Sequence, residues 1–273
     1  MSLIHQLYCT HCTHGSSALE RSQGEMAARM LGYSVRAGSL EGDRLRQLYR
    51  QVERYISYHL PRDTPGHAKL EWTAAAAPRR LVFIPSAGRL QVIALVSYRQ
   101  RDSAGRPGSY FAHVLCREPR PAESAWTAAD ALRLWNAPGW VAEDAAEHPF
   151  VLPALARADS LLGGASPAID DAAFLRFLQG ARGAEDAWLP ERWRQMPARE
   201  RAAFFQRALG ALIAAGTARR QTVFLAVEPE VAALLFYGAA RLVPPGDLRA
   251  SIGVSTFEPS ADRLVTALAA TTF

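Results

Sequence analysis

The residues around which the rest of the chain is arranged run from Gly88 to Cys116 and read GRLQVIALVSYRQRDSAGRPGSYFAHVLC. Within Leu90–Tyr98 the alternation places apolar side chains on both faces of a strand. A strand that is apolar on both faces is typical of the middle of a sheet with cover on each side. Because Tyr110–Cys116 is a second apolar run, the stretch predicts two such strands in the core of the domain.

The connection between these strands is polar and spans Arg99–Gly108. It carries three arginines, namely Arg99, Arg101 and Arg106. The pattern therefore predicts a solvent-exposed, basic loop that projects from the most deeply buried part of the domain.

The composition is that of a globular protein, with 49% hydrophobic and 21% charged residues in a chain of 273. The longest apolar runs, residues 208–216 and 222–227, are far shorter than the roughly 20 residues that a membrane span requires. The N-terminus has no secretion signal, and three cysteines do not make a disulfide framework. We therefore expect a cytoplasmic protein without a membrane segment.

The formal net charge of +5 does not indicate a nucleic-acid-binding protein. Of the 31 basic residues only Lys69 is a lysine, and the arginines are scattered along the chain. They do not line up with aromatic residues, as a groove that stacks bases would require. A nucleic-acid sensor is kept as the third hypothesis, which predicts binding that falls steeply with added salt.

Periodic patterns predict further elements on either side of the central pair. Ser17-Ala-Leu-Glu20 has the spacing of a capping box, and the helix that it opens is expected to run to about Leu31. Apolar residues from Leu45 to Ile56 recur at three- and four-residue intervals, which is typical of one helix face. The remaining expectations are strands over residues 4–10 and 80–84 and a helix from Thr127 to Pro138.

Between Pro138 and Pro167 the composition changes to prolines, a Gly163-Gly164 pair and acidic residues. We interpret this segment as the boundary between two modules, residues 1–150 and residues 151–273. The first module is expected to hold a mixed or antiparallel sheet with helices. The second is expected to be a smaller α/β unit, so the fold class is α/β.

The second module alternates helices and strands. Thr222–Val227 predicts a buried strand, and Glu228-Pro-Glu230 opens a helix with Leu242 on its apolar side. Strand, helix and strand in succession imply parallel pairing. Helices are also expected over 170–178 and 197–216, the latter with Ile213 in its apolar stripe, and strands over 252–257 and 264–268. Because the chain stops in apolar residues, we expect it to be a fragment of a longer protein.

Several common enzyme signatures do not occur in the sequence. Lys69 follows Ala68 rather than a glycine, so there is no phosphate loop of the Walker type. The turn after Val227 has Glu228 and Glu230 where a dinucleotide site would need glycines and a place for phosphate. The stretch 253–257 begins like a nucleophile elbow but ends in Phe257. The spacing of serine, histidine and carboxylate residues does not indicate a catalytic triad.

Two groups of residues could instead support a catalytic or metal-binding function. Cys9, Cys12 and His14 are weak candidates for metal ligands, because a structural zinc site needs four ligands and Cys116 lies in a predicted core strand. No cofactor is therefore assigned. His113 lies on the same strand face as Phe111 and Leu115, so we interpret it as a core histidine with one hydrogen bond. The other interpretation is a general base at a sheet end.

The chain resembles a bacterial family, the GTPase-associated adaptor proteins. The opening Ile4–Tyr8, the segment Gly32–Arg36 and the segment Gly105–Leu115 resemble its N-terminal domain, and residues from about Asp170 resemble its middle domain. The resemblance implies a cytoplasmic, non-enzymatic adaptor that binds a GTPase encoded nearby in a bacterial conflict or defence system. Full-length members continue into a further domain. The cluster at Cys9–His14 departs from the family pattern.

The resemblance suggests one sharper hypothesis, and one competing hypothesis stands beside it. A loop arginine among Arg99, Arg101 and Arg106 is a candidate for partner binding, as an arginine finger in the partner's nucleotide site. The competing hypothesis is a metal-dependent hydrolase or nuclease effector that uses His113 and the Cys9–His14 cluster. The partner's identity, the surface that binds it, the activating trigger and the oligomeric state stay open.

Overall fold

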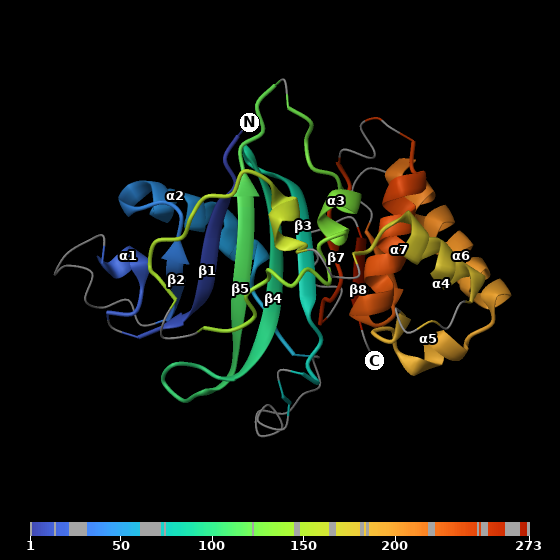
Figure 1. Cartoon of the computed structure of the whole chain (residues 1–273), viewed down its shortest axis with the longest axis horizontal. Coiled ribbons are helices and arrows are strands. Elements are labelled where there is room, and N and C mark those ends of the chain that lie inside the picture. Colours follow the sequence, from blue (N-terminus) through green and yellow to red (C-terminus); the bar gives the residue numbers. More distant parts are fainter. Residues whose placement is uncertain are drawn as a thin grey trace.

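The structure is a computed structural model of the chain, shown in Figure 1. It describes residues 2–13, 15–21, 32–60, 72–73, 75–121, 123–144, 148–163, 168–180, 183, 186–217, 222–244, 246, 251–259 and 268–271. The helix expected beyond Arg21 and most of the strand expected over 264–268 lie outside these residues. Within them, no helix is long and apolar enough to cross a membrane.

One eight-stranded sheet runs through the centre of the molecule, in the order β2-β1-β5-β4-β3-β7-β8-β6 (Figure 1). The pairs from β2 to β7 are antiparallel, and β7, β8 and β6 are parallel to one another. The strands are β1 (His5–Cys12), β2 (Gly32–Gly38), β3 (Arg80–Ala87), β4 (Leu90–Arg101), β5 (Pro107–Arg117), β6 (Val223–Ala226), β7 (Val254–Ser255) and β8 (Leu268–Thr271). The α/β fold class expected from the sequence is confirmed.

The central pair is the β4–β5 hairpin, which is longer than the sequence indicated. Its ladder continues through Arg99, which is opposite Ser109, to Arg101, which is opposite Pro107. Arg99 and Arg101 therefore belong to β4, and the connecting turn is confined to residues 102–106. The expectation that both lie in a loop was wrong because polar residues at a strand end continue the backbone ladder past the buried part of the sheet.

One face of the sheet is covered by α1 (Ala18–Arg21), α2 (Gly42–Val52) and η2 (Glu53–Tyr55). In Figure 1, α2 lies behind the strands. The predicted periodicity is confirmed, because Leu45, Leu48 and Val52 are buried against side chains from the even-numbered positions of β4. Burying a leucine side chain stabilises a fold by roughly 1.5–3 kcal/mol, so these contacts are enough to hold a short helix in place.

The start of α1 departs from the predicted capping box. The hydroxyl of Ser17 accepts from the Leu19 amide at 3.2 Å, as a cap does. Glu20, however, accepts from the Gly15 amide at 2.7 Å, which closes the preceding turn.

The other face of the sheet is covered by α3 (Ala128–Leu132) and by a helical group that lies at the right of Figure 1. Thr127 and Asp130 form the predicted cap of α3 reciprocally, although the helix ends at Leu132 rather than at Pro138. The helical group contains α4 (Asp171–Gln179), α5 (Glu191–Gln195), α6 (Ala198–Thr217) and α7 (Pro229–Leu242), and η4 (Ala158–Leu161) precedes it.

Three expectations for the second half need correction. Strand β6 is partly exposed rather than buried, because it is the last strand in the sheet order. Ile213 and Leu242, which were expected on apolar faces, are 47% and 57% exposed, because their neighbours Leu212 and Val243 occupy the buried side at these positions. The strand expected over 252–257 is confined to β7, and beyond it Thr256 and Glu258 bond to β3 through their side chains. The predicted parallel orientation of β6 and β7 is confirmed, but the two strands do not pair directly, because β8 lies between them and pairs with both.

The segment after α3 crosses the sheet instead of leaving it. Ile4 bridges to Leu155, and Gly38 bridges to Val151, so this segment adds short backbone contacts to β1 and β2. We call residues 136–144 and 148–155 the crossing segment. The division into modules 1–150 and 151–273 stays a prediction.

A buried arginine joins the two halves of the chain at the sheet. Arg80 in β3 is 3% exposed, and its guanidinium donates to Glu258 Oε1 at 2.6 Å. It also donates to the Tyr55 carbonyl at 2.6 Å and to Ser255 Oγ at 3.1 Å. A buried charge needs a partner of this kind, because an unpaired one is strongly destabilising.

Candidate functional site

The turn of the β4–β5 hairpin is held by its own aspartate. The Asp102 amide donates to the Arg106 carbonyl at 3.0 Å, and the Gly105 amide donates to the Asp102 carbonyl at 2.9 Å. Gly105 has φ +80°, which is the left-handed conformation that this turn needs just before its last residue, Arg106. The Asp102 carboxylate also accepts from the amides of Ala104 and Arg106, each at 2.8 Å. The loop is therefore a rigid platform.

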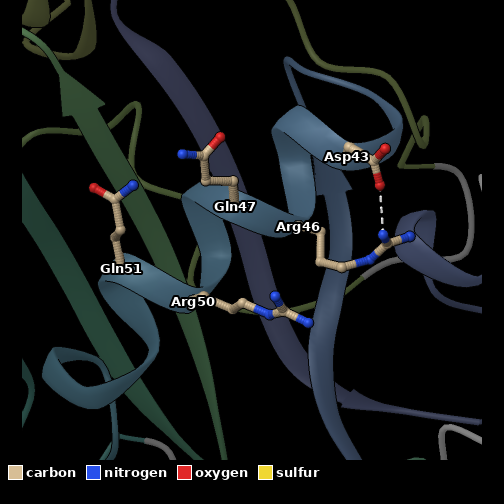
Figure 2. A pocket seen from close by; sticks show the side chains of 5 residues that line it. All are labelled: Asp43, Arg46, Gln47, Arg50 and Gln51. Atoms are coloured by element: carbon tan, nitrogen blue, oxygen red, sulfur yellow. Dashed lines mark hydrogen bonds and ion pairs between the residues drawn. The ribbon is translucent and has the colours of Figure 1, made fainter.

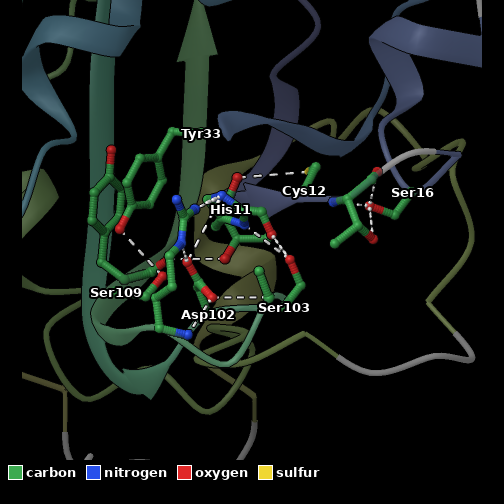
Figure 3. Close-up of polar contacts among 12 residues, drawn as sticks. His11, Cys12, Ser16, Tyr33, Asp102, Ser103 and Ser109 are labelled. Atoms are coloured by element: carbon green, nitrogen blue, oxygen red, sulfur yellow. Dashed lines mark hydrogen bonds and ion pairs between the residues drawn. The ribbon is translucent and has the colours of Figure 1, made fainter. Parts of the chain in front are cut away.

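His11, at the end of β1, lies against this turn and is 5% exposed (Figure 3). The Ser103 hydroxyl donates to the His11 carbonyl at 2.9 Å, and His11 Nδ1 lies 3.0 Å from Ser103 Oγ. Because the single hydrogen of the Ser103 hydroxyl is donated to the carbonyl, His11 Nδ1 must carry the ring proton and donate it to Ser103 Oγ. His11 Nε2 then accepts from the guanidinium of Arg106.

Arg106 completes the cluster by donating from Nε to Asp102 Oδ2 at 2.7 Å. Partial burial alone would raise the pKa of Asp102, but the hydrogen bonds from the amide and the guanidinium of Arg106 hold that pKa below its ordinary value. Asp102 is therefore ionised and turned inward, with 7% of its side chain exposed against 64% for Arg106.

Tyr33, the second residue of β2, forms an aromatic platform next to His11. Its ring stacks on Tyr110 with centroids 4.2 Å apart and an angle of 7° between the planes. The Tyr33 hydroxyl donates to Ser109 Oγ at 3.2 Å, and its carbonyl accepts from the Tyr49 hydroxyl at 3.1 Å. The ring is held on one face and at its end, and Tyr33 is still 39% exposed.

The structure describes partners for each of the three arginines predicted to bind a partner. Arg99 donates to Glu143 at 2.9 Å, and Arg101 donates to the Gly105 carbonyl at 2.8 Å. Arg106 is engaged by Asp102 and His11. Arg99 and Arg106 are therefore each paired with a carboxylate, whereas the described contact of Arg101 is to a carbonyl.

Ser103, His11 and Asp102 together contain the residue types of a catalytic triad (Figure 3), which the sequence spacing did not reveal. His11 Nδ1 is 3.0 Å from Ser103 Oγ, and His11 Nε2 is 3.8 Å from Asp102 Oδ2. The proton positions differ from those of a triad, because Nδ1 donates to the serine instead of accepting from it. The amides that would stabilise an oxyanion bond to Asp102.

His113 is a core residue, as the core interpretation predicted, with two hydrogen bonds rather than one. Its Nδ1 accepts from the Val141 amide at 3.1 Å, so Nε2 carries the proton and donates to Gln6 Oε1 at 3.0 Å. The Gln6 amide group donates in turn to the Pro153 carbonyl at 2.8 Å. Burial lowers the pKa of His113 to about 3, so the ring is neutral. This chain of bonds fastens the crossing segment to the sheet.

The cysteines of the candidate metal cluster are buried thiols. Cys9 packs in the cluster on the α2 face of the sheet, whereas His113 contacts Tyr8 and Trp140 on the other face. Burial raises the pKa of Cys9 well above its ordinary value and that of Cys12 to about 12. His14 lies outside the described residues, among which there is no group of three or more His, Cys, Asp or Glu side chains that could hold a metal ion. The sheet therefore separates His113 from Cys9.

The acidic start of α7 is also engaged by neighbouring side chains. Glu228 accepts from Arg192 at 2.6 Å and from the indole of Trp193 at 2.9 Å. Burial raises the pKa of Glu230, and the charge of Arg79 opposes that shift. Two carboxylates therefore occupy this helix start, each close to an arginine.

Two surface hollows contain polar side chains. The first lies along α2 and is lined by Asp43, Arg46, Gln47, Arg50 and Gln51 (Figure 2), all from one helix. The second lies where α3, α4 and α7 meet, and in it Asp171 accepts from Tyr237 at 2.8 Å and from Arg241 at 2.9 Å. In the first hollow Arg46 pairs with Asp43, and in the second Arg241 pairs with Asp171.

The fold places the chain among α/β proteins with a largely antiparallel central sheet. Residues 3–158 match the sequence model of GTPase-associated protein 1, N-terminal domain type 2, and because this match covers more than half of the chain, the protein belongs to that family. No curated protein and no solved structure matched the chain.

Proposed function

We propose that the protein is a non-enzymatic adaptor that binds a GTPase in the cytoplasm, as part of a bacterial conflict or defence system. The single observation that carries this proposal is the family match over residues 3–158, because the name of the family associates it with GTPases. The GTPase is expected to be the product of a neighbouring gene.

The roles of the reactive side chains support an adaptor rather than an enzyme. His113 is neutral and forms a structural chain of hydrogen bonds, and the Ser103 hydroxyl donates its proton to the His11 backbone carbonyl rather than to a side-chain base. The buried thiols of Cys9 and Cys12 have raised pKa values, which disfavours the nucleophilic thiolate. A protein of this kind would leave the nucleotide chemistry to its partner.

The three hairpin arginines remain the candidates for an arginine finger. A finger must extend a guanidinium into the partner's site, and it accelerates GTP hydrolysis by a large factor. Arg101 is the best placed of the three, since its one described side-chain bond is to a carbonyl, whereas Arg99 and Arg106 contact carboxylates.

The test is co-purification of the tagged protein with the GTPase encoded next to it, followed by measurement of GTP turnover. We expect a stable complex and no GTP hydrolysis by the isolated adaptor. Turnover is then compared between the complex of the native protein and complexes that carry Arg99→Ala, Arg101→Ala or Arg106→Ala. Failure to form a complex, or hydrolysis by the isolated chain, would overturn the adaptor proposal. Unchanged turnover in all three variants would exclude the finger alone.

A further inference from the structure

Four strand ends meet at one end of the sheet and form a single small surface. The end of β1 brings His11 and the start of β2 brings Tyr33 (Figure 3). The end of β4 brings Arg101, and the turn that follows it brings Arg106. We call these four residues, with Asp102 and Ser103 between them, the tip surface. None of the three sequence segments indicates this arrangement alone, because it depends on strand register.

The charges at the tip surface are arranged so that a partner meets positive charge. The carboxylate there belongs to Asp102, whose side chain is 7% exposed, while that of Arg106 is 64% exposed. Arg101 is exposed as well. A negatively charged group that approaches from solvent therefore meets two guanidinium groups before it meets the carboxylate.

Arg106 is oriented before any partner arrives. A guanidinium has five N–H donors, and the described contacts with Asp102 and His11 engage one on Nε and one on Nη2. The donors that remain match the two oxygens of a carboxylate. Because Asp102 and His11 already fix the side chain, binding loses less conformational entropy than it would with a mobile arginine.

Tyr33 supplies the apolar part of the same surface. Its stacking on Tyr110 and its hydroxyl bond to Ser109 fix the ring, and its exposure leaves area for contact. Rigid tyrosines and arginines are the residue types that carry most of the binding energy at protein interfaces.

We propose that the tip surface is where the adaptor docks an acidic segment of its GTPase partner, with a carboxylate on Arg106 and an apolar side chain on Tyr33. This inference rests on the proposed function and names the surface and the chemistry that it recognises. An acidic protein segment fits better than nucleic acid, because one aromatic platform and two arginines do not make a groove that follows a phosphate backbone.

The test measures the affinity of full-length adaptor variants for the GTPase encoded by the neighbouring gene. We expect Tyr33→Ala and Arg106→Ala to weaken binding about tenfold each, and Arg106→Glu to weaken it further. Arg50→Ala, an exposed arginine on α2, is the matched control and should change the affinity less than about twofold. Higher salt should weaken the native complex more than that of Arg106→Ala.

Two conservative variants separate binding from folding. Tyr33→Phe keeps the ring, and its dissociation constant should be within about threefold of that of the native protein. Arg106→Lys keeps the charge but loses the two parallel N–H donors of the guanidinium, so it should bind weakly. If the native protein binds the GTPase and all tip variants bind equally well, the docking surface is wrong and the adaptor proposal stands. If the native protein does not bind it, both fail. Tip variants that weaken only binding to a single-stranded oligonucleotide would replace the proposal with a nucleic-acid site.

Discussion

His113 shows what a histidine contributes when its two nitrogens have fixed and different roles. Nδ1 accepts from the backbone of the crossing segment and Nε2 donates to Gln6. The neutral ring fits both partners, and a second ring proton would remove the acceptor that Val141 needs. The residue stabilises the fold through its neutral form, and this makes its contribution depend on pH.

The first prediction concerns that dependence. The pKa of His113 is about 3 in the folded protein and 6.5 in the unfolded chain. The unfolded state therefore binds more protons between these values, and the stabilisation is complete above about pH 6.5 and is lost as the pH falls towards about 3. From pH 7.5 to pH 5 the free energy of unfolding should fall by about 2 kcal/mol more in the native protein than in His113→Gln. Urea unfolding at several pH values measures this, and a difference independent of pH would contradict it.

The second prediction compares a buried ion pair with an exposed one. Removing the carboxylate in Glu258→Ala leaves the Arg80 guanidinium buried without its charge partner, which should lower the free energy of unfolding by about 3–5 kcal/mol. The matched control is Asp171→Ala, which breaks the pair with Arg241 at a site where both side chains are well exposed. Asp171→Ala should lower the free energy of unfolding by less than about 1 kcal/mol. Equal losses in urea unfolding would show that Arg80 finds another partner.

At the scale of elements, two glycines in helices provide a test of packing. A Cβ atom at Gly238 in α7 would lie 2.2 Å from the ring of Phe174 in α4, whereas a Cβ atom at Gly210 in α6 would meet nothing within 4 Å. Gly238 therefore lets two helices approach closely, and Gly210 has no such role in the described contacts.

The third prediction follows from this pair. Gly238→Ala should destabilise the protein by about 1–3 kcal/mol, because the clash exceeds the gain in helix propensity. Gly210→Ala should instead stabilise it by up to about 1 kcal/mol, because an alanine in an open helix position loses less entropy on folding. Thermal unfolding of both variants measures whether each substitution raises or lowers the melting temperature. Stabilisation by both substitutions would mean that α4 and α7 move apart to accept the methyl group at Gly238.

Elements with local patterns were predictable, and contacts between distant segments were not. The alternation in β4 assigned Val92 and Ile93 to opposite faces, and the structure confirms it. The helix spacing in α2 and the cap at Thr127 were predicted equally well, because helix periods and caps depend on residues close together in the sequence. The contact of His11 with Arg106 depends on the register of β1, β2 and β5, which no local pattern contains. Tyr33 was therefore recognised as part of a family motif and not as an exposed platform.

At the scale of the whole molecule, the sheet runs without a break through both halves of the sequence. Val82 of β3 pairs with Ser255 of β7, and the main hydrophobic cluster contains Leu81 and Phe83 from β3 together with Phe174 and Leu234 from the helical group. Shared burial of this kind couples the unfolding of the two halves.

The fourth prediction uses that coupling to test the division into modules. Calorimetry should show one transition whose van't Hoff enthalpy equals the calorimetric enthalpy. Glu258→Ala should shift this single transition downwards without splitting it. Two separate transitions would show that residues 1–150 and 151–273 unfold independently, as two autonomous domains do.

The position of Arg80 also matters while the protein is being made. Its carboxylate partner is 178 residues later in the chain. At about 5–20 residues per second, the ribosome needs roughly 10 to 35 s to deliver that partner after Arg80 has been synthesised. During this interval the nascent chain holds a charged strand next to an open hydrogen-bonding edge, a state that invites association with other chains. Polypeptides stopped before residue 258 would remain in that state, so we expect them to depend on chaperones that the finished protein does not need.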